Sequence, residues 1–161
     1  MGADMNGTIA TIGYEGSTIS DFVAALRRVS IDVLIDVREL PLSRKKGFSK
    51  NQLAETLAAA GIEYVHLRGL GDPKTGRQAA RAGKYALFET IFNRHMKTEA
   101  ALSDMSVAAG LVRAHRACLM CFECNHTKCH RSIVADQLAK MTQLTVTPLT
   151  VHDMGVGRVA A

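Results

Sequence analysis

The sequence predicts a single α/β domain: three layers, with a mostly parallel sheet of about five strands and helices on both faces. Short runs of β-branched and apolar residues alternate along the 161-residue chain with segments of helical periodicity. Such alternation is typical of parallel strands joined by right-handed helical crossovers. No internal repeat, low-complexity tract or linker divides the chain. We therefore expect one flavodoxin-like or small Rossmann-like domain over residues 1–161, with loose ends at 1–7 and 154–161. The strand order is not readable from the sequence.

Five segments have the composition of strands: residues 8–12, 31–37, 62–67, 117–122 and 144–149. The second is an almost continuous apolar run, as expected for a strand buried on both faces. Pro148 lies in the last segment. Proline cannot donate a ladder hydrogen bond, so this strand is predicted at an edge of the sheet.

The first two helices have recognisable ends. Ser17 or Thr18 can cap a helix that follows the first strand, and Ser49 can cap a second. Gly61 is placed where a glycine commonly ends a helix.

The second half of the chain is richer in helix. Residues 78–115 are mostly helical in pattern, with a break expected near Ser103 or Gly110. A last helix is predicted over Ser132–Met141.

Composition indicates a soluble globular protein, with 47% apolar residues and a formal net charge of +5. No apolar run approaches the roughly 20 residues that cross a bilayer. The N-terminus lacks the features of a signal peptide, so we expect a cytoplasmic protein without a membrane partner.

In that compartment the four cysteines are expected to be reduced, and to be reactive or metal-binding rather than disulfide-bonded. The positive charge weakly favours anionic partners, namely a phosphate-bearing small molecule or a nucleic acid.

Polar loops follow four of the predicted strands. Ligands of open α/β sheets bind beyond the carboxyl ends of the strands, so these loops are expected to form one pocket. They contain Gly13-Tyr14-Glu15-Gly16-Ser17, the Asp36 region, the Gly71 region and the cysteine-rich stretch 121–131. In the loop after Asp36, the residues Arg38, Ser43 and Arg44 are candidates for binding an anion.

The sequence Cys129-His130-Arg131 lies at the approach to the last predicted helix. Unpaired N–H groups and the helix dipole favour an anion there and also favour thiolate, so Cys129 is a candidate nucleophile. Arg131 is a candidate phosphate ligand, and His130 a candidate catalytic group. Alternatively, His130 and Arg131 cap the helix and pair with nearby carboxylates.

Two carboxylates end buried strands. Asp36 and Glu123 are candidates for nucleophile and acid–base roles. Alternatively, Asp36 pairs with Arg38. The turn of Gly13, Tyr14 and Ser17 can bind phosphate through its N–H groups, or can be an ordinary tight turn with a serine cap.

Metal binding is a further alternative. Cys121-x-x-Cys124, followed by His126, Cys129 and His130, offers ligands for zinc. No second CxxC pair stands at finger-like spacing, so no metal or other cofactor is expected. If zinc is bound, Cys121, Cys124 and Cys129 are the expected ligands.

Several motifs together resemble the bacterial and archaeal family named domain of unknown function 488. They are Thr11-Ile12-Gly13-Tyr14 with Ser17, Ile35-Asp36-Val37-Arg38 with Pro41 and Ser43-Arg44, Gly69-Leu70-Gly71, Cys121-Phe122-Glu123, and Cys129-His130-Arg131. The resemblance implies a small α/β domain. It also hints at nucleoside deoxyribosyltransferase-like proteins that act on modified DNA bases. Cys118 and Cys124 depart from the family pattern.

The function expected from these residues is an enzyme that acts on a nucleotide or nucleic-acid base, with N-glycosidic bond cleavage as one reaction. An oxocarbenium-like transition state suits two nearby carboxylates. One alternative is phosphoryl or sulfur transfer by Cys129. Another is a module without catalysis that binds a metal or nucleic acid.

Overall fold

The computed structural model describes residues 7–125 and 129–151. The predicted loose ends and His126 lie outside these ranges, apart from Gly7. Within the described ranges, no helix is long and apolar enough to span a bilayer.

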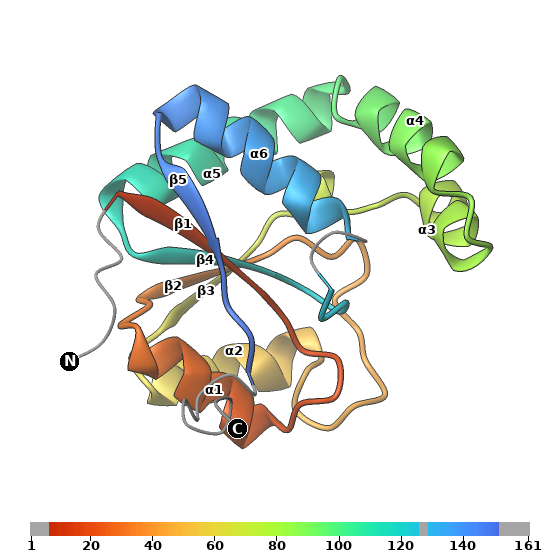
Figure 1. Cartoon of the computed structure of the whole chain (residues 1–161). Coiled ribbons are helices and arrows are strands. Elements are labelled where there is room, and N and C mark those ends of the chain that lie inside the picture. Colours follow the sequence, from red (N-terminus) through yellow and green to blue (C-terminus); the bar gives the residue numbers. More distant parts are fainter. Residues whose placement is uncertain (1–6, 126–128, 152–161) are drawn as a thin grey trace, which may run out of the picture.

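One sheet of five parallel strands forms the centre of the domain (Figure 1). Its strands are β1 (Thr8–Gly13), β2 (Val33–Asp36), β3 (Glu63–His66), β4 (Ala117–Cys121) and β5 (Thr145–Pro148). The predicted three-layer α/β class is therefore confirmed. The strand with Pro148 is at an edge, as predicted.

The strand order is β3-β2-β4-β1-β5. It differs from the flavodoxin order 2-1-3-4-5 and from the Rossmann order 3-2-1-4-5-6, because β4 lies between β1 and β2. The first two crossovers run toward one edge of the sheet and the last two run back. Right-handed crossovers then place the later helices on the opposite face.

The helices are α1 (Ile19–Arg28), α2 (Lys50–Ala59), α3 (Lys74–Arg81), α4 (Tyr85–His95), α5 (Glu99–Ala114) and α6 (His130–Thr142), with a short 3₁₀ helix, η1 (Arg68–Leu70). The Thr18 hydroxyl caps α1 by accepting a hydrogen bond from the N–H of Asp21 at 3.1 Å. Ser49 is at the N-cap of α2, but its hydroxyl does not bond to the helix. Gly61 follows α2 with a positive φ of 78°, as its predicted role requires.

The helical region before β4 differs from the prediction. Its breaks lie between α3 and α4 and between α4 and α5, whereas Ser103 and Gly110 are inside α5. Gly83, with φ of 75°, ends the first helix of this region, and Thr98 caps α5 by accepting from the N–H of Ala101. The last helix begins at His130, two residues before the predicted start, with Cys129 as its N-cap.

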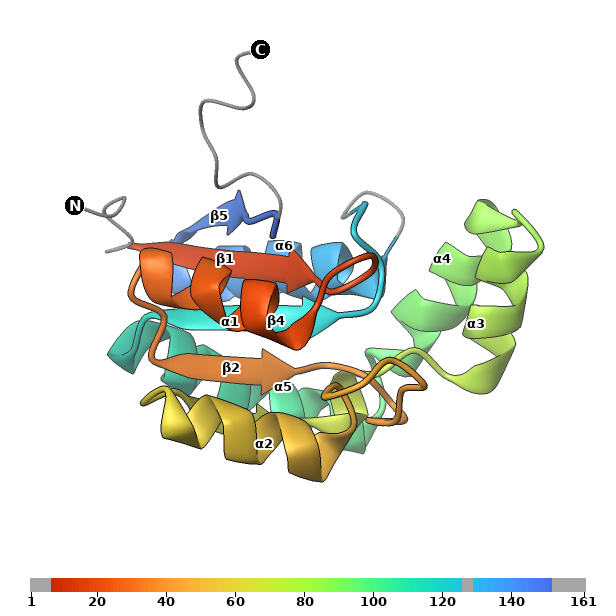
Figure 2. The same ribbon diagram turned by 90° about the horizontal axis from the view of Figure 1, so that it is seen from below.

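Side chains from the two faces of the sheet fill separate cores. One core lies under α1 and α2, where Phe22 and Leu57 pack with Ile12 and Leu34. The other lies under α5 and α6. The α3–α4 pair projects beyond the carboxyl ends of the strands (Figure 2). The loops after β1 and β2 lead to helices on one face of the sheet, and the loop after β4 leads to a helix on the other face. They separate beneath the α3–α4 pair. Open α/β sheets bind ligands at such a point.

Candidate functional site

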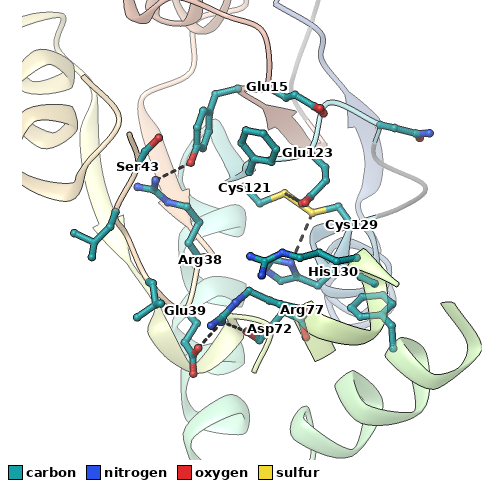
Figure 3. A pocket seen from close by; sticks show the side chains of 18 of the residues that line it. Glu15, Arg38, Glu39, Ser43, Asp72, Arg77, Cys121, Glu123, Cys129 and His130 are labelled. Carbon is teal, nitrogen blue, oxygen red and sulfur yellow. Dashed lines mark hydrogen bonds and ion pairs between the residues drawn. A yellow bond between two sulfur atoms is a disulfide. The ribbon is translucent and has the colours of Figure 1, made fainter. Parts of the chain in front are cut away.

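A cavity of about 740 Å³ opens at the carboxyl edge of the sheet (Figure 3). The loops after β1, β2 and β4, the segment before α3, the helices α3 and α4, and the start of α6 line it. Its polar lining includes Glu15, Arg38, Glu39, Ser43, Arg44, Lys45, Asp72, Arg77, Arg81, Glu123, Cys129 and His130. The expected convergence of the strand-end loops is thus observed.

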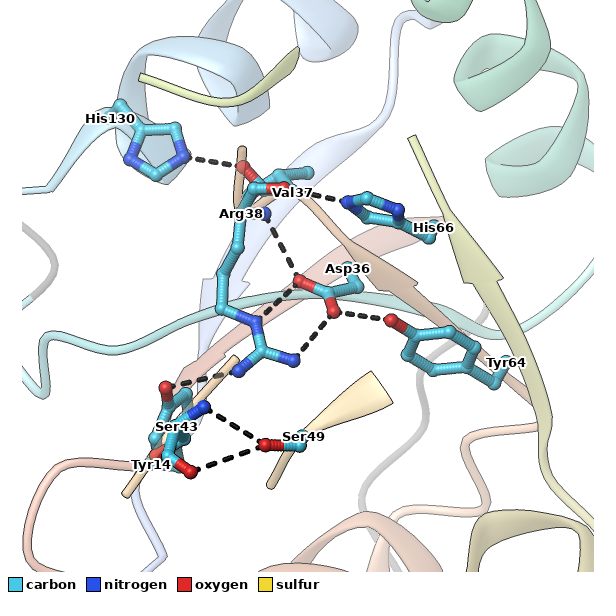
Figure 4. A network of polar contacts seen from close by, with 9 residues as sticks. All are labelled: Tyr14, Asp36, Val37, Arg38, Ser43, Ser49, Tyr64, His66 and His130. Carbon is cyan, nitrogen blue, oxygen red and sulfur yellow. Dashed lines mark hydrogen bonds and ion pairs between the residues drawn. The ribbon is translucent and has the colours of Figure 1, made fainter. Parts of the chain in front are cut away.

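Asp36 is fully buried and does not line the cavity. Its carboxylate accepts two hydrogen bonds from the Arg38 guanidinium, at 2.9 and 2.8 Å, and one from the Arg38 N–H (Figure 4). The Tyr64 hydroxyl donates to the same carboxylate at 2.5 Å. With both oxygens occupied, Asp36 fits the alternative role of pairing with Arg38.

This pairing presents the Arg38 guanidinium to the cavity. Burial lowers the pKa of Arg38, but the hydrogen bonds and charge of Asp36, together with Tyr14, outweigh burial, so the pKa is raised overall. Arg38 also donates to the Tyr14 hydroxyl at 3.1 Å, and the Tyr14 ring stacks on Phe48. Arg38 therefore carries a permanent charge in a defined orientation.

Asp72 is a site residue that sequence reasoning missed. It follows η1 and precedes α3, it is 5% exposed, and its Oδ1 has no hydrogen-bond partner. Burial raises the pKa of Asp72 to about 7; Arg77 opposes this shift, while Glu123 and Glu39 reinforce it. Its position in the strand-end loop Gly71-Asp72-Pro73 was the available signal. That signal is weak because Asp-Pro is also a common turn.

Glu123 lines the same cavity and comes from the loop after β4. Burial raises its pKa; Arg131 and Arg81 oppose the shift, and Glu15 reinforces it. Its Oε1 is 3.9 Å from Sγ of Cys121. Asp72 and Glu123 thus place two carboxyl groups in one cavity, as predicted for the site but with Asp72 rather than Asp36 as the second member.

Three cations, Arg44, Lys45 and Arg81, line the cavity, and we call them the cationic rim. Within the described residues, no ion pair joins any of them to a carboxylate, whereas Arg77 pairs with Glu39 and Arg38 with Asp36. Exposed aromatic rings, Tyr85 and Phe122, lie in the same lining. The rim suits an anion and the rings suit a planar group.

Cys129 and Cys121 are joined as a disulfide at the floor of the cavity, although the sequence favours reduced cysteines. His130 follows Cys129, and its Nε2 donates to the carbonyl of Val37 at 2.7 Å. Burial lowers the pKa of His130 to about 4, so the imidazole is neutral. Both residues lie in the lining, as predicted.

Arg131 is fully buried and does not line the cavity. Its guanidinium donates to Sγ of Cys121 at 3.1 Å and to the carbonyls of Glu123 and Cys124. In this structure these bonds hold the loop after β4, and the predicted phosphate contact of Arg131 stays a prediction. Helix α6 places this side chain beneath the loop, because His130 already begins the helix.

The first loop packs against the loop after β4 and offers few free N–H groups. The N–H groups of Tyr14 and Glu15 donate to the carbonyls of Cys121 and Phe122. Gly13, Ser17 and Gly71 do not line the cavity, and the buried Ser17 hydroxyl has no hydrogen-bond partner. Gly71 is needed for packing, since a Cβ there would lie 2.3 Å from the N atom of Glu39.

Replacing Gly13 with alanine should destabilise the protein. Its Cβ would lie 1.7 Å from the carbonyl oxygen of Glu123, so the backbone of one loop must move. We expect a loss of about 1–3 kcal/mol in the free energy of unfolding, measured by urea denaturation. Gly110→Ala is the matched control, since nothing lies within 4 Å of a Cβ there. Equal stability of the Gly13→Ala variant and the wild type would contradict this close approach.

Replacing Asp72 with asparagine should stabilise the protein at neutral pH. The carboxyl has a pKa of about 7 when folded and an ordinary value of 3.8. Between these values the unfolded chain releases its proton first, so the wild type loses stability as pH rises from about 4 to 7. The Asp72→Asn variant lacks this loss. From pH 5 to pH 8, its advantage over the wild type should grow by about 2–3 kcal/mol in urea denaturation. A constant difference between the two proteins would contradict the raised pKa.

Residues 18–138 match the model of the family described as "Domain of unknown function DUF488". Searches of the curated proteins and of the solved structures found no match.

Proposed function

Given that the chain belongs to the DUF488 family, whose description leaves its activity open, we propose from the cavity itself that the protein cleaves the N-glycosidic bond of a nucleotide or nucleic-acid base. Asp72 serves as the general acid and Glu123 as the carboxylate that stabilises positive charge on the sugar. The cationic rim holds the phosphate.

The observation that carries this proposal is the Asp72 carboxyl group. It lies in the cavity lining, it is almost fully buried, and one of its oxygens has no hydrogen-bond partner. A buried structural carboxyl group would normally have its hydrogen bonds satisfied. With a pKa of about 7, this group carries a proton at neutral pH for part of the time and can donate it.

The reaction follows from these positions. The bond between the sugar carbon and the base nitrogen breaks, its electron pair goes to the nitrogen, and Asp72 supplies the proton that the leaving base needs. The sugar carbon becomes oxocarbenium-like, and a nearby carboxylate stabilises that charge. Water then adds to the carbon, and its proton returns to the Asp72 carboxylate. The products are a free base and either a sugar phosphate, from a nucleotide, or an abasic strand, from a nucleic acid.

Substrate binding is assigned to charged and aromatic side chains that line the cavity. Arg44, Lys45 and Arg81 supply charge for the phosphate. Phe122 and Tyr85 are 44% and 40% exposed, and they supply faces on which a base can stack. Arg38 is held in place by Asp36 and contributes a further donor.

Phosphoryl or sulfur transfer by Cys129 is less well supported. Its sulfur is paired with that of Cys121 in this structure, so attack by Cys129 would require the reduced protein. Arg131, which would hold the anion in that reaction, is turned toward backbone carbonyls.

The test is to incubate the purified chain with nucleosides, nucleoside monophosphates and oligonucleotides that carry normal or modified bases, and to detect free base by chromatography. We expect release from phosphate-bearing substrates. Arg81→Ala and Arg44→Ala should raise KM more than they lower kcat, because these side chains bind the phosphate in ground and transition state alike. Lys50→Ala, on the exposed surface outside the cavity, is the control. No release from any member of the panel would overturn the proposal.

A further inference from the structure

Three soft donor groups meet at the floor of the cavity. They are Sγ of Cys121, Sγ of Cys129 and a ring nitrogen of His130, and these atoms all lie within 4.8 Å of one another. They come from the end of β4 and the start of α6, so the fold brings together residues that are eight and nine positions apart. Figure 3 shows the two sulfur atoms between Glu123 and His130.

The backbone spacing of the two cysteines suits a bridging ion better than a disulfide. Their Cα atoms are 7.7 Å apart. Native disulfides usually join Cα atoms about 4.4–6.8 Å apart, and a wider pair needs backbone movement. Two thiolates on one tetrahedral zinc ion, each about 2.3 Å from the metal, are about 3.8 Å apart. Their Cα atoms can therefore be farther apart than those of a disulfide.

His130 is oriented as a metal ligand. Its Nε2 is 2.7 Å from the carbonyl oxygen of Val37, which can only accept, so Nε2 carries the hydrogen. The Nδ1 of the neutral ring therefore carries no hydrogen, and its lone pair lies 3.7 Å from Sγ of Cys129. A sulfur and a nitrogen on the same tetrahedral zinc are about 3.6 Å apart. Metal-bound histidines almost always donate their other N–H to such a carbonyl or carboxylate.

The surrounding charges suit a dithiolate site that opens to the cavity. One divalent cation balances two thiolates, and the Arg131 guanidinium donates to Sγ of Cys121 at 3.1 Å. All three donor residues line the cavity, so a fourth position faces its interior. The Glu123 carboxylate stands beside it, 3.9 Å from Sγ of Cys121. Three protein ligands and an open position are the arrangement of catalytic rather than structural zinc sites.

We propose that the reduced protein binds one zinc-like divalent cation through Cys121, Cys129 and the Nδ1 of His130, with the fourth position open to the cavity. Binding displaces one proton from each thiol. In this ligand set His130 replaces Cys124, which the sequence had indicated through the CxxC motif. The site does not depend on the proposed glycosidic function, whose acid, Asp72, is not one of the ligands.

The experiment uses the full chain, reduced and freed of metal with a chelator, and titrated with Co²⁺. We expect saturation near one ion per chain, with sulfur-to-cobalt charge-transfer absorption and the intense visible bands of a tetrahedral site. Added Zn²⁺ should displace the cobalt. Before the titration, an aliquot is alkylated at its thiols and analysed by mass spectrometry, which verifies that Cys121 and Cys129 are reduced. A reduced chain without charge-transfer absorption would overturn the proposal, and this result needs no variant.

Variants identify the ligands. Cys129→Ser and His130→Gln should weaken cobalt binding by more than about 100-fold, beyond the 10- to 100-fold that loss of an outer-shell partner causes. Cys124→Ser is the matched control and should bind as the wild type does, because Cys124 does not belong to the donor group. Circular dichroism establishes that each variant is folded. Equal weakening by Cys124→Ser and Cys129→Ser would refute the assigned ligand set.

Discussion

Asp72→Asn and Glu123→Gln are each expected to lower the rate of base release by about 100- to 10,000-fold, the usual contribution of a positioned acid or base. Asparagine keeps the size of Asp72 but has no proton to give to the leaving base. In the proposed reaction, glutamine at position 123 removes the negative charge that stabilises the sugar cation. The rates are measured under single-turnover conditions, so that binding does not mask chemistry.

The controls separate chemistry from folding. Glu55→Gln changes an exposed carboxylate on α2, outside the cavity, and should leave the rate unchanged. Asp72→Asn should be more stable than the wild type at pH 8 and yet less active, which unfolding cannot explain. Because Glu123 lies close to Cys121, cobalt binding by Glu123→Gln is measured as well. A wild-type rate in the Asp72→Asn variant would remove Asp72 from the reaction.

Gly76→Ala tests the position of the same acid. A Cβ at Gly76 would lie 2.0 Å from Oδ1 of Asp72, so the carboxyl group must turn away. Alanine is the better residue inside a helix by about 1 kcal/mol, so α3 itself should not be weakened. We expect reduced base release by a folded protein. Unaltered release would show that the observed orientation of Asp72 is not required.

Asp36→Asn is expected to destabilise the protein by about 3–5 kcal/mol, because it leaves the buried Arg38 charge without its partner. Asp36 is fully buried, and Arg38 is 7% exposed. The free energy of unfolding is measured by urea denaturation at pH 7.

Two further variants define the cause. Tyr64→Phe removes only the hydroxyl that donates to Asp36, and should cost about 1–2 kcal/mol. Replacing both partners, as Asp36→Leu with Arg38→Met, should cost less than Asp36→Asn alone, since no charge is then left buried. If Asp36→Asn costs less than 1 kcal/mol, the carboxylate does not hold Arg38 as the structure indicates.

The architecture was largely predictable from local pattern. Four of the strands carry an apolar or β-branched run, β3 (Glu-Tyr-Val-His) shows polar–apolar alternation, and the alternation of strands with helices implied parallel pairing. The strand order could not be predicted. It depends on which strand each crossover passes, and no local sequence pattern indicates this. The break between α4 and α5 was misplaced because Gly110 is tolerated inside a helix that packs on the core.

For the site, the sequence by itself determined that polar loops meet at one edge of the sheet, since parallel strands place their carboxyl ends together. It also singled out Glu123, Arg38, Cys129 and His130, which all line the cavity. Only the tertiary structure decided how each group is placed. Burial put Asp36 and Arg131 outside the cavity lining and raised the pKa of Asp72, and the fold brought donor atoms of Cys121, Cys129 and His130 within 4.8 Å of one another. Burial and partner geometry arise from residues far apart in the chain, and a motif read along the sequence contains neither.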